Sequence, residues 1–129
     1  MAMVNSATAF SSDFAPKRVE APVDLAHLRR FTMGDEALEL EILGLFSGQL
    51  PITITALKQA DTEKAWGIAA HTLKGSARAV GAWSLATIAE NAERLRPMPD
   101  AAARGHVIER LEAAADAVQE YIASLAPPA

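Results

Sequence analysis

The sequence predicts an all-α protein: an antiparallel, up-down four-helix bundle with a short additional N-terminal helix that covers one end. Three observations favour this fold class. Alanine, the strongest helix former, occupies 28 of the 129 positions. Aromatic residues make up only 5% of the chain, and runs of β-branched residues are short, which disfavours a β-sandwich. Apolar residues recur at steps of three and four between capping residues, with connections of only a few residues.

Composition narrows the class of protein further. Half of the residues are apolar, which is typical of a folded domain, and the length fits a single core. The 16 acidic and 12 basic side chains give a net charge of −4 without a basic block, which disfavours a nucleic-acid surface. The chain has no cysteine, so disulfides, thiolate metal sites and cysteine nucleophiles are excluded.

The chain divides into a flexible N-terminal arm over residues 1–21 and one domain over residues 22–126. The arm lacks the basic start and continuous apolar run of a secretory signal. No stretch approaches the roughly 20 apolar residues that a membrane-spanning helix needs. We therefore expect a cytoplasmic protein that does not contact a membrane.

The first two helices are predicted from caps and apolar spacing. Asp24 caps a short helix that reaches about Thr32, with an apolar side made of Leu25, Leu28 and Phe31. Asp35 caps a second helix that reaches about residue 59. Its predicted apolar face consists of Leu38, Ile42, Leu45, Phe46 and Gln49, followed by Ile52, Ile54 and Leu57. Pro51 either bends this helix or breaks it at Leu50.

Three further helices follow. Asp61 or Thr62 caps the third, which runs to Val80 and ends with Gly81 in the left-handed conformation. Ser84 caps the fourth, from Leu85 to Arg96, and Pro97 and Pro99 stop it. Asp100 caps the fifth, whose apolar face is predicted to comprise Ile108, Leu111, Ala115, Val118, Ile122 and Leu125.

The third helix has a core face on one side and polar, potentially reactive side chains on the other. With about 100° per residue and Trp66 at zero, the core residues fall within about 40° of one line: Trp66, Ala70, Leu73, Ala77 and Val80. The other side carries Lys74 at about 80°, Arg78 at about 120°, His71 at about 140°, Gly75 at about 180° and Ile68 at about 200°. This placement predicts that the imidazole of His71 points into solvent.

Gly75 indicates that this exposed histidine is accessible to another molecule. A glycine inside a helix is about 1 kcal/mol less favourable than alanine, and this chain uses alanine almost everywhere else. Its missing side chain leaves His71 accessible to an incoming macromolecule. The residues alone leave two interpretations open: a nucleophilic imidazole that meets an anionic group on a partner, or an ordinary surface histidine, as we expect for His27 and His106.

The residues around His71 resemble a known family motif. The run Ala70-His71-Thr72-Leu73-Lys74-Gly75-Ser76-Ala77, followed by Val80-Gly81-Ala82, is similar to the signature of histidine-containing phosphotransfer (HPt) domains. The resemblance extends to Val23-Asp24, to Gly34-Asp35 and to Phe46, and it covers about residues 22 to 125.

The resemblance implies a role for each matching residue. His71 corresponds to the phospho-accepting histidine, and Lys74 to the lysine that helps to neutralise the phosphoryl group. Gly75 corresponds to the glycine that leaves room for a receiver domain. Glu93 stands where many members carry a glutamine or glutamate that orients the imidazole, although a solvated carboxylate is an equal alternative. Docking is expected on the strip of Ile68, His71, Gly75 and Arg78, with contributions from the second and fourth helices.

The resemblance also implies a function. His71 would accept a phosphoryl group from the phospho-aspartate of a response-regulator receiver domain, such as that of a hybrid histidine kinase, and pass it to another receiver. No cofactor is expected in the chain itself, since Mg²⁺ belongs to the receiver. The sequence lacks a Gly-rich phosphate loop, so the protein would be a covalent phospho-carrier without ATP-dependent kinase activity. We expect a monomer, because no second apolar seam is evident.

Two alternatives remain at this level. A helical binding module could dock on a histidine kinase or receiver and inhibit it without carrying phosphate. A purely structural bundle is the third possibility, although it has no use for Gly75 beside an exposed histidine.

Overall fold

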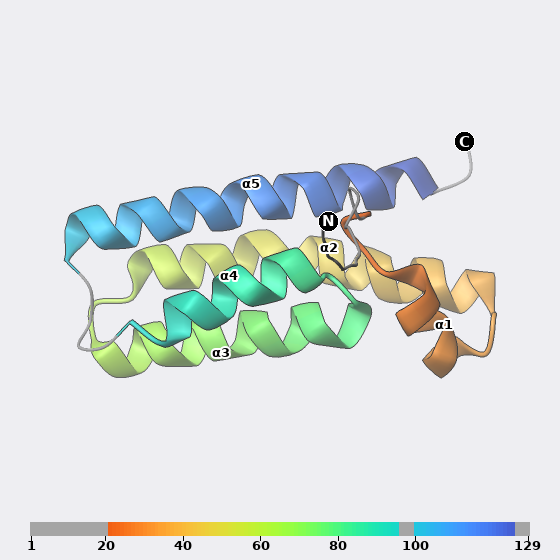
Figure 1. Ribbon diagram of the computed structural model, residues 1–129, viewed down its shortest axis with the longest axis horizontal. Helices are drawn as coiled ribbons and strands as arrows, with labels where there is room; N and C mark the ends of the chain where they lie inside the picture. Colours follow the sequence, from red (N-terminus) through yellow and green to blue (C-terminus); the bar gives the residue numbers. More distant parts are fainter. Residues whose placement is uncertain (1–20, 96–99, 126–129) are drawn as a thin grey trace, which may run out of the picture.

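The computed structural model describes residues 21–95 and 100–125, and within these ranges it contains five α-helices and no strand (Figure 1). The helices are α1 (Leu25–Thr32), α2 (Glu36–Gln59), α3 (Glu63–Val80), α4 (Trp83–Glu93) and α5 (Ala101–Leu125). The predicted all-α class is therefore confirmed. The predicted arm before Ala21 lies outside the described residues, as do Arg96, Pro97 and Pro99. The prediction that the fourth helix runs to Arg96 is wrong, because α4 ends at Glu93 and the described Arg94 and Leu95 are no longer helical.

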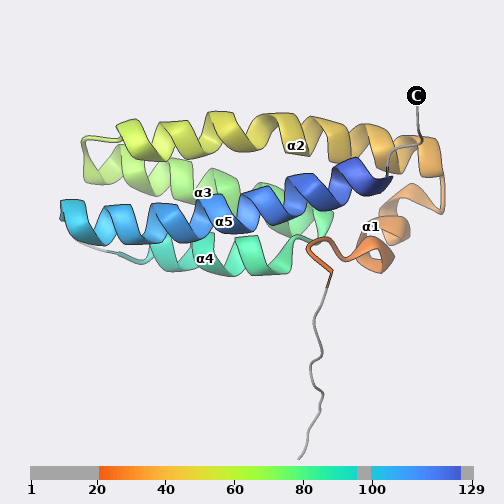
Figure 2. The same cartoon turned by 90° about the horizontal axis from the view of Figure 1, so that it is seen from above.

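The four longer helices lie side by side, as both views show (Figures 1 and 2). α3 packs against α2 and α4, and α5 packs against the same two helices. The short α1 contacts α2 and α3 at one end. Each long helix contributes large, fully buried side chains to one core: Leu43, Leu50, Leu57, Trp66, Leu73, Leu85 and Leu111.

Asp24 fastens the start of α1 to the turn between α3 and α4. One carboxylate oxygen caps α1 by accepting a hydrogen bond from the backbone N–H of His27 (3.2 Å), and the other accepts one from the indole of Trp83 (2.9 Å). The indole bond is the largest cause that lowers the pKa of Asp24. Gly81 is left-handed, with a φ of 84°, and a Cβ there would lie 2.8 Å from the carbonyl oxygen of Asp24. The predicted roles of Asp24 and Gly81 are confirmed.

The outer side of α1 differs from the prediction in one residue. Leu28 is buried and Leu25 packs against the core, but Phe31 is 70% exposed. The ring of Phe31 contacts the edge of His27, whose other neighbour is Trp83. Phe31 therefore belongs to a surface cluster of rings, because α1 rests on the end of the bundle and only one side of it reaches the core.

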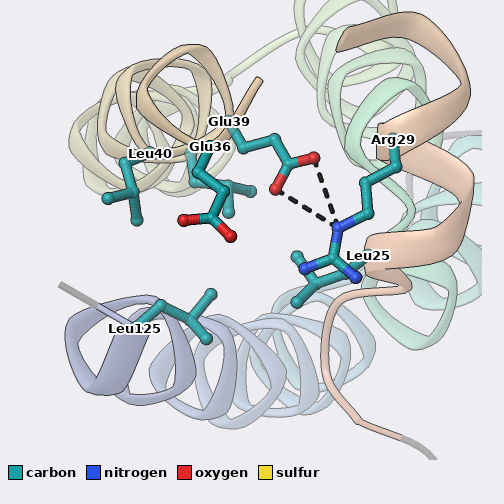
Figure 3. Close-up of a pocket in the computed structure, with 7 residues that line it drawn as sticks. Leu25, Arg29, Glu36, Glu39, Leu40 and Leu125 are labelled. Carbon is teal, nitrogen blue, oxygen red and sulfur yellow. Dashed lines mark hydrogen bonds and ion pairs between the residues drawn. The ribbon is translucent and has the colours of Figure 1, made fainter. Parts of the chain in front are cut away.

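A buried carboxylate joins α1 to α2 (Figure 3). Glu39 is buried and accepts hydrogen bonds from the hydroxyl of Thr32 (2.9 Å) and from the guanidinium Nε of Arg29. Arg29 extends from α1 to this carboxylate, beside a small pocket whose lining includes Leu25 and Leu125. A buried carboxylate is tolerated only when it is paired in this way, so this contact serves to anchor α1.

Pro51 does not break the second helix, because α2 continues through it to Gln59. A proline at position 51 has no N–H for the carbonyl of Ser47, four residues earlier. The side-chain amide of Gln119, on α5, donates a hydrogen bond to that carbonyl instead, at 3.0 Å. The acceptor that the proline leaves open is thus satisfied by a neighbouring helix.

The face of α2 that packs on the core was predicted only in part: Phe46, Ile54 and Leu57 are buried as expected and Ile42 packs against the core. Its buried residues are Glu39, Leu43, Phe46, Leu50, Thr53, Ile54 and Leu57. Leu45 and Ile52 are 71% and 61% exposed, and Leu38 and Gln49 are also exposed. Apolar residues stand at helical spacing on two sides of α2, and packing against α3 and α5 decides which side is buried.

The exposed apolar side of α2 also bears on two further expectations. Within the described ranges, α2 is the one helix long and apolar enough, by length and composition, to cross a membrane, contrary to the prediction that no stretch comes close. A core helix of a bundle meets the same criterion, and α2 packs against α3 and α5. The prediction that no second apolar seam is evident overlooked Leu38, Leu45 and Ile52, which are exposed at seven-residue steps along one side of α2.

The remaining helix ends follow local capping, with one exception. Thr62 caps α3 through the N–H of Ala65 (3.0 Å), and Asp100 caps α5 through the N–H of Ala103 (2.9 Å). The fourth helix begins earlier than predicted. Its N-cap is Ala82, without a side-chain hydrogen bond, and Ser84 lies within its first turn.

The early start of α4 has a local cause, and the buried face of α5 differs from the prediction only near its start. The N–H of Ala82 bonds to the carbonyl of Ala77 (2.8 Å) as part of the turn that ends α3, so α4 can begin at once. On α5, Val107 is buried and the predicted Ile108 is only half-buried. The predicted face is correct from Leu111 onward, where the buried residues are Leu111, Ala115, Val118 and Ile122.

Candidate functional site

His71 stands on the outer side of α3, with its side chain 68% exposed. The core face predicted for this helix is buried throughout: Trp66, Ala70, Leu73, Ala77 and Val80. Burial of that stripe fixes the rotation of α3, and the imidazole consequently faces solvent. The exposure expected from the helical wheel is observed.

Glu93, the last residue of α4, lies against the imidazole. Its Oε2 is 2.8 Å from Nδ1 of His71. An ionised carboxylate can only accept, so Nδ1 carries the proton and donates, and in the neutral imidazole Nε2 is then left with a free lone pair. Of the two alternatives for Glu93, a solvated carboxylate and a partner of the imidazole, the structure has the second.

Lys74 also binds Glu93. Its ammonium is 2.6 Å from Oε1 of the carboxylate, and its side chain is only 16% exposed. Lys74 was predicted among the outward residues, but its side chain lies largely covered between α3 and α4, where it pairs with this carboxylate. The hydrogen bond from Lys74, followed by the one from His71, lowers the pKa of Glu93 below its ordinary value of 4.5.

The position of Glu93 depends on a buried hydrogen bond in the core. The indole N–H of Trp66, on α3, donates to the carbonyl of Ala92 on α4, at 2.8 Å. This bond joins the two helices at the residue before Glu93. The core therefore determines where the carboxylate meets the imidazole.

Gly75 lies one turn after His71 on the exposed side of α3. A Cβ added there would meet no heavy atom within 4 Å, and the backbone is in the ordinary helical range. The fold among the described residues therefore does not require glycine at this position. Its missing side chain matters only to something that approaches from outside.

The other two residues predicted for docking lie on the same side of α3. Ile68 is 57% exposed. Arg78 is exposed, and its guanidinium pairs with Glu90 of α4 (3.3 Å), which also binds Arg94 (3.2 Å). The structure thus brings an apolar group, the imidazole and a cation together along one helix.

Sequence reasoning missed several residues of this surface. A shallow hollow of about 440 Å³ lies next to His71, and its lining includes Lys64 and Gly67. Both follow a helical spacing from His71, at seven and four residues before it, which is the signal that could have identified them. In the described part of the chain, no group of three or more histidine or acidic residues could hold a metal ion.

The family assignment agrees with this geometry. The family described as Hpt domain matches residues 19–121 of the chain. The protein belongs to the Hpt domain family. This Hpt protein is similar to a solved structure, that of the histidine phosphotransferase ShpA from Caulobacter crescentus, with 34% sequence identity. The match covers 80% of this chain and 88% of the ShpA chain, with a TM-score of 0.59. No curated protein matches the chain.

At the level of the family, the Hpt protein is a histidine phosphocarrier of phosphorelays, and Hpt domains interact with the receiver domains of two-component systems. The arrangement around His71 has the elements that such chemistry uses: an accessible lone pair on Nε2, a carboxylate behind the ring, and space beside it for a second protein.

Proposed function

We propose that this Hpt protein accepts a phosphoryl group on His71 from the phospho-aspartate of one receiver domain and passes it to the aspartate of another. The observation that supports this most is the orientation of the imidazole, whose Nδ1 is held by Glu93 at 2.8 Å while the ring is exposed. The domain over residues 22–126, arranged as an antiparallel up-down four-helix bundle with α1 over one end, acts as a rigid support.

The transfer step follows from this orientation. The lone pair on Nε2 attacks phosphorus, the bond between phosphorus and the aspartyl oxygen breaks, and the aspartate leaves with that electron pair. The ring becomes positively charged, and its Nδ1–H remains bonded to the ionised Glu93, which stabilises this charge. Return of the group to a second aspartate reverses each change. Positioning and charge account for most of the catalysis of such transfers.

Lys74 takes part through Glu93. Its ammonium holds the second carboxylate oxygen, which keeps Glu93 ionised and fixes it in place. The positive charge also offsets part of the negative charge that arrives with the phosphoryl group. Mg²⁺ is supplied by the receiver domain, and the Hpt protein itself needs no cofactor.

The docking surface extends from α3 to α2. On α3 it comprises Ile68, His71 and Gly75, with Arg78 at its rim. We assign the exposed Leu45 and Ile52 of α2, which packs against α3, to the same surface as its apolar part. Apolar side chains around a gap above Gly75 suit a partner that docks closely and then dissociates.

The remaining attributes belong to the same proposal. The partners are response-regulator receivers, one of which can belong to a hybrid histidine kinase. The protein acts in the cytoplasm as a monomer, apart from nucleic acid and membranes. It relays phosphate without using ATP.

A label-transfer experiment tests the proposal. Receiver domains carrying radiolabelled phospho-aspartate are mixed with the Hpt protein, and the label is expected on the protein in an acid-labile, base-stable form. His71→Gln should remove the label, whereas His27→Gln and His106→Gln, on α1 and α5, should retain it. Label on the His71→Gln variant would show that another residue accepts the group. A wild-type protein that binds receivers without acquiring label would instead be an inhibitor.

A further inference from the structure

The hollow beside His71 lies on the N-terminal side of the histidine. Its lining residues run along α3 from Glu63 to Thr72 and include Lys64, Gly67 and Ile68. Side chains on a helix lean towards its N-terminus and cover the positions three and four residues earlier. The imidazole of His71 therefore leans over Ile68 and Gly67. A phosphoryl group on Nε2 would project into this hollow.

Gly67 contributes space to the hollow. It stands inside α3, where glycine is less favourable than alanine, and it is four residues before His71. Gly67 and His71 line the same hollow, so a side chain at position 67 would take up part of its space. Two glycines thus flank the imidazole along α3, with Gly75 on the C-terminal side and Gly67 on the side where the phosphoryl group would be.

Lys64 brings a positive charge to the same hollow. It is exposed, lies two turns before His71, and shares its side of the helix, since seven residues rotate an α-helix by about 700°, or 20° short of two turns. Among the described residues, no carboxylate lies within ion-pair distance of its ammonium. Lys74, in contrast, is occupied by Glu93 at 2.6 Å and is largely covered.

We propose that Lys64 binds the oxygens of the phosphoryl group carried by His71, in a subsite whose space is provided by Gly67. This inference rests on the proposed function, because it concerns the phosphorylated form of the same histidine. Lys64 and His71 line the same hollow, and the flexible stem of Lys64 lets its ammonium turn towards the phosphoryl oxygens. It also offsets Glu63, whose carboxylate lines the same hollow and would otherwise repel a phosphoryl dianion.

The experiment phosphorylates the protein without a receiver. Phosphoramidate transfers its phosphoryl group directly to histidine and releases ammonia, so the readout does not depend on docking. The titration of the phosphoryl group is then followed by ³¹P NMR in the wild type, Lys64→Ala and Lys64→Arg. The matched control is Lys58→Ala, on α2, whose ammonium pairs with Glu112 of α5.

A cation beside the phosphoryl group favours its dianion. Lys64→Ala should therefore raise the pH midpoint of the phosphoryl titration by about 0.3–0.6 unit, as expected for one charge at several ångströms in water. Lys64→Arg should restore the wild-type midpoint, and Lys58→Ala should leave it unchanged. A loss of packing would not produce this pattern, because arginine rescues through charge.

The outcomes separate this inference from the proposed function. If Lys64→Ala titrates as the wild type does, the subsite is wrong, even when receivers exchange phosphate with His71 normally. If the shift is present but no receiver exchanges phosphate with the wild type, the subsite stands and the relay function fails. If phosphoramidate does not label His71 while a phosphorylated receiver does, the subsite is wrong and the relay function stands.

Discussion

Replacing Gly75 with alanine should make the isolated domain more stable and reduce phosphotransfer. The new Cβ would meet no heavy atom within 4 Å, and the backbone at this position is ordinary helix, so nothing in the domain opposes the change. The whole difference in helix propensity, about 0.8–1 kcal/mol, should appear in the free energy of unfolding. For a domain of this size such a gain raises Tm by about 4 °C or more.

The functional effect has the opposite sign. The methyl group would stand one turn from His71, where the receiver approaches, and would hold the phospho-aspartate away from Nε2. Small displacements of this kind reduce transfer rates strongly, and we expect a larger loss for Gly75→Gln. Gly105→Ala is the matched control: its Cβ also meets no heavy atom within 4 Å, but it lies on α5, away from the site.

Urea unfolding followed by circular dichroism gives the stability, and label transfer from a phosphorylated receiver gives the rate. Gly105→Ala should stabilise the domain and transfer phosphate at the wild-type rate. Gly75→Ala should also stabilise the domain, but it should transfer phosphate more slowly than the wild type. If Gly75→Gln transferred as fast as the wild type, close approach at this position would be unnecessary. A destabilised Gly75→Ala would show that the glycine serves packing instead.

Two further predictions concern stability. The ammonium of Lys74 and the imidazole of His71 lower the pKa of Glu93, so in acid the unfolded chain binds more protons than the folded protein does. The contribution of this carboxylate to stability is therefore present above pH 4.5 and lost as the pH falls. The difference in unfolding free energy between wild type and Glu93→Gln should shrink in acid, and a difference that is constant with pH would contradict this. Gln119→Leu should cost about 1 kcal/mol by leaving the carbonyl of Ser47 without a donor. Pro51→Ala supplies that donor and should recover most of the loss in the double variant, whereas strictly additive effects in urea unfolding would disprove the compensation.

Helix ends were the most predictable part of the fold. Caps such as Asp24, Thr62 and Asp100 act on the next few residues, so their effect can be read locally. The start of α4 could not be read in this way. Ser84 looks like a cap in the sequence, but the turn that ends α3 and the bond from Trp83 to Asp24 let the helix begin two residues earlier.

The buried side of α2 required the tertiary structure. Leu45 and Ile52 follow a helical spacing as well as Leu43 and Leu50 do, and periodicity alone does not distinguish the two sides. The choice depends on which side meets α3 and α5. Leu45 and Ile52 were therefore predicted to lie in the core, although both are exposed.

The site was predictable where it depends on one helix. The exposure of His71 and the open space at Gly75 follow from the rotation of α3, which its buried stripe determines. The partnership of Lys74 with Glu93 depends on how α3 and α4 pack, and the two residues are far apart in sequence. Spacing placed Lys74 outward for that reason, and only the contact between the helices shows that it is held inward.

The bond from Trp66 to the carbonyl of Ala92 has a consequence for how such a protein can diversify. The reactive pair of ring and carboxylate is secured from the interior, by an indole that no partner touches. Exposed residues such as Ile68 on α3 and Leu45 and Ile52 on α2 take no part in that support. They can be exchanged to suit a different receiver while the chemistry is inherited intact.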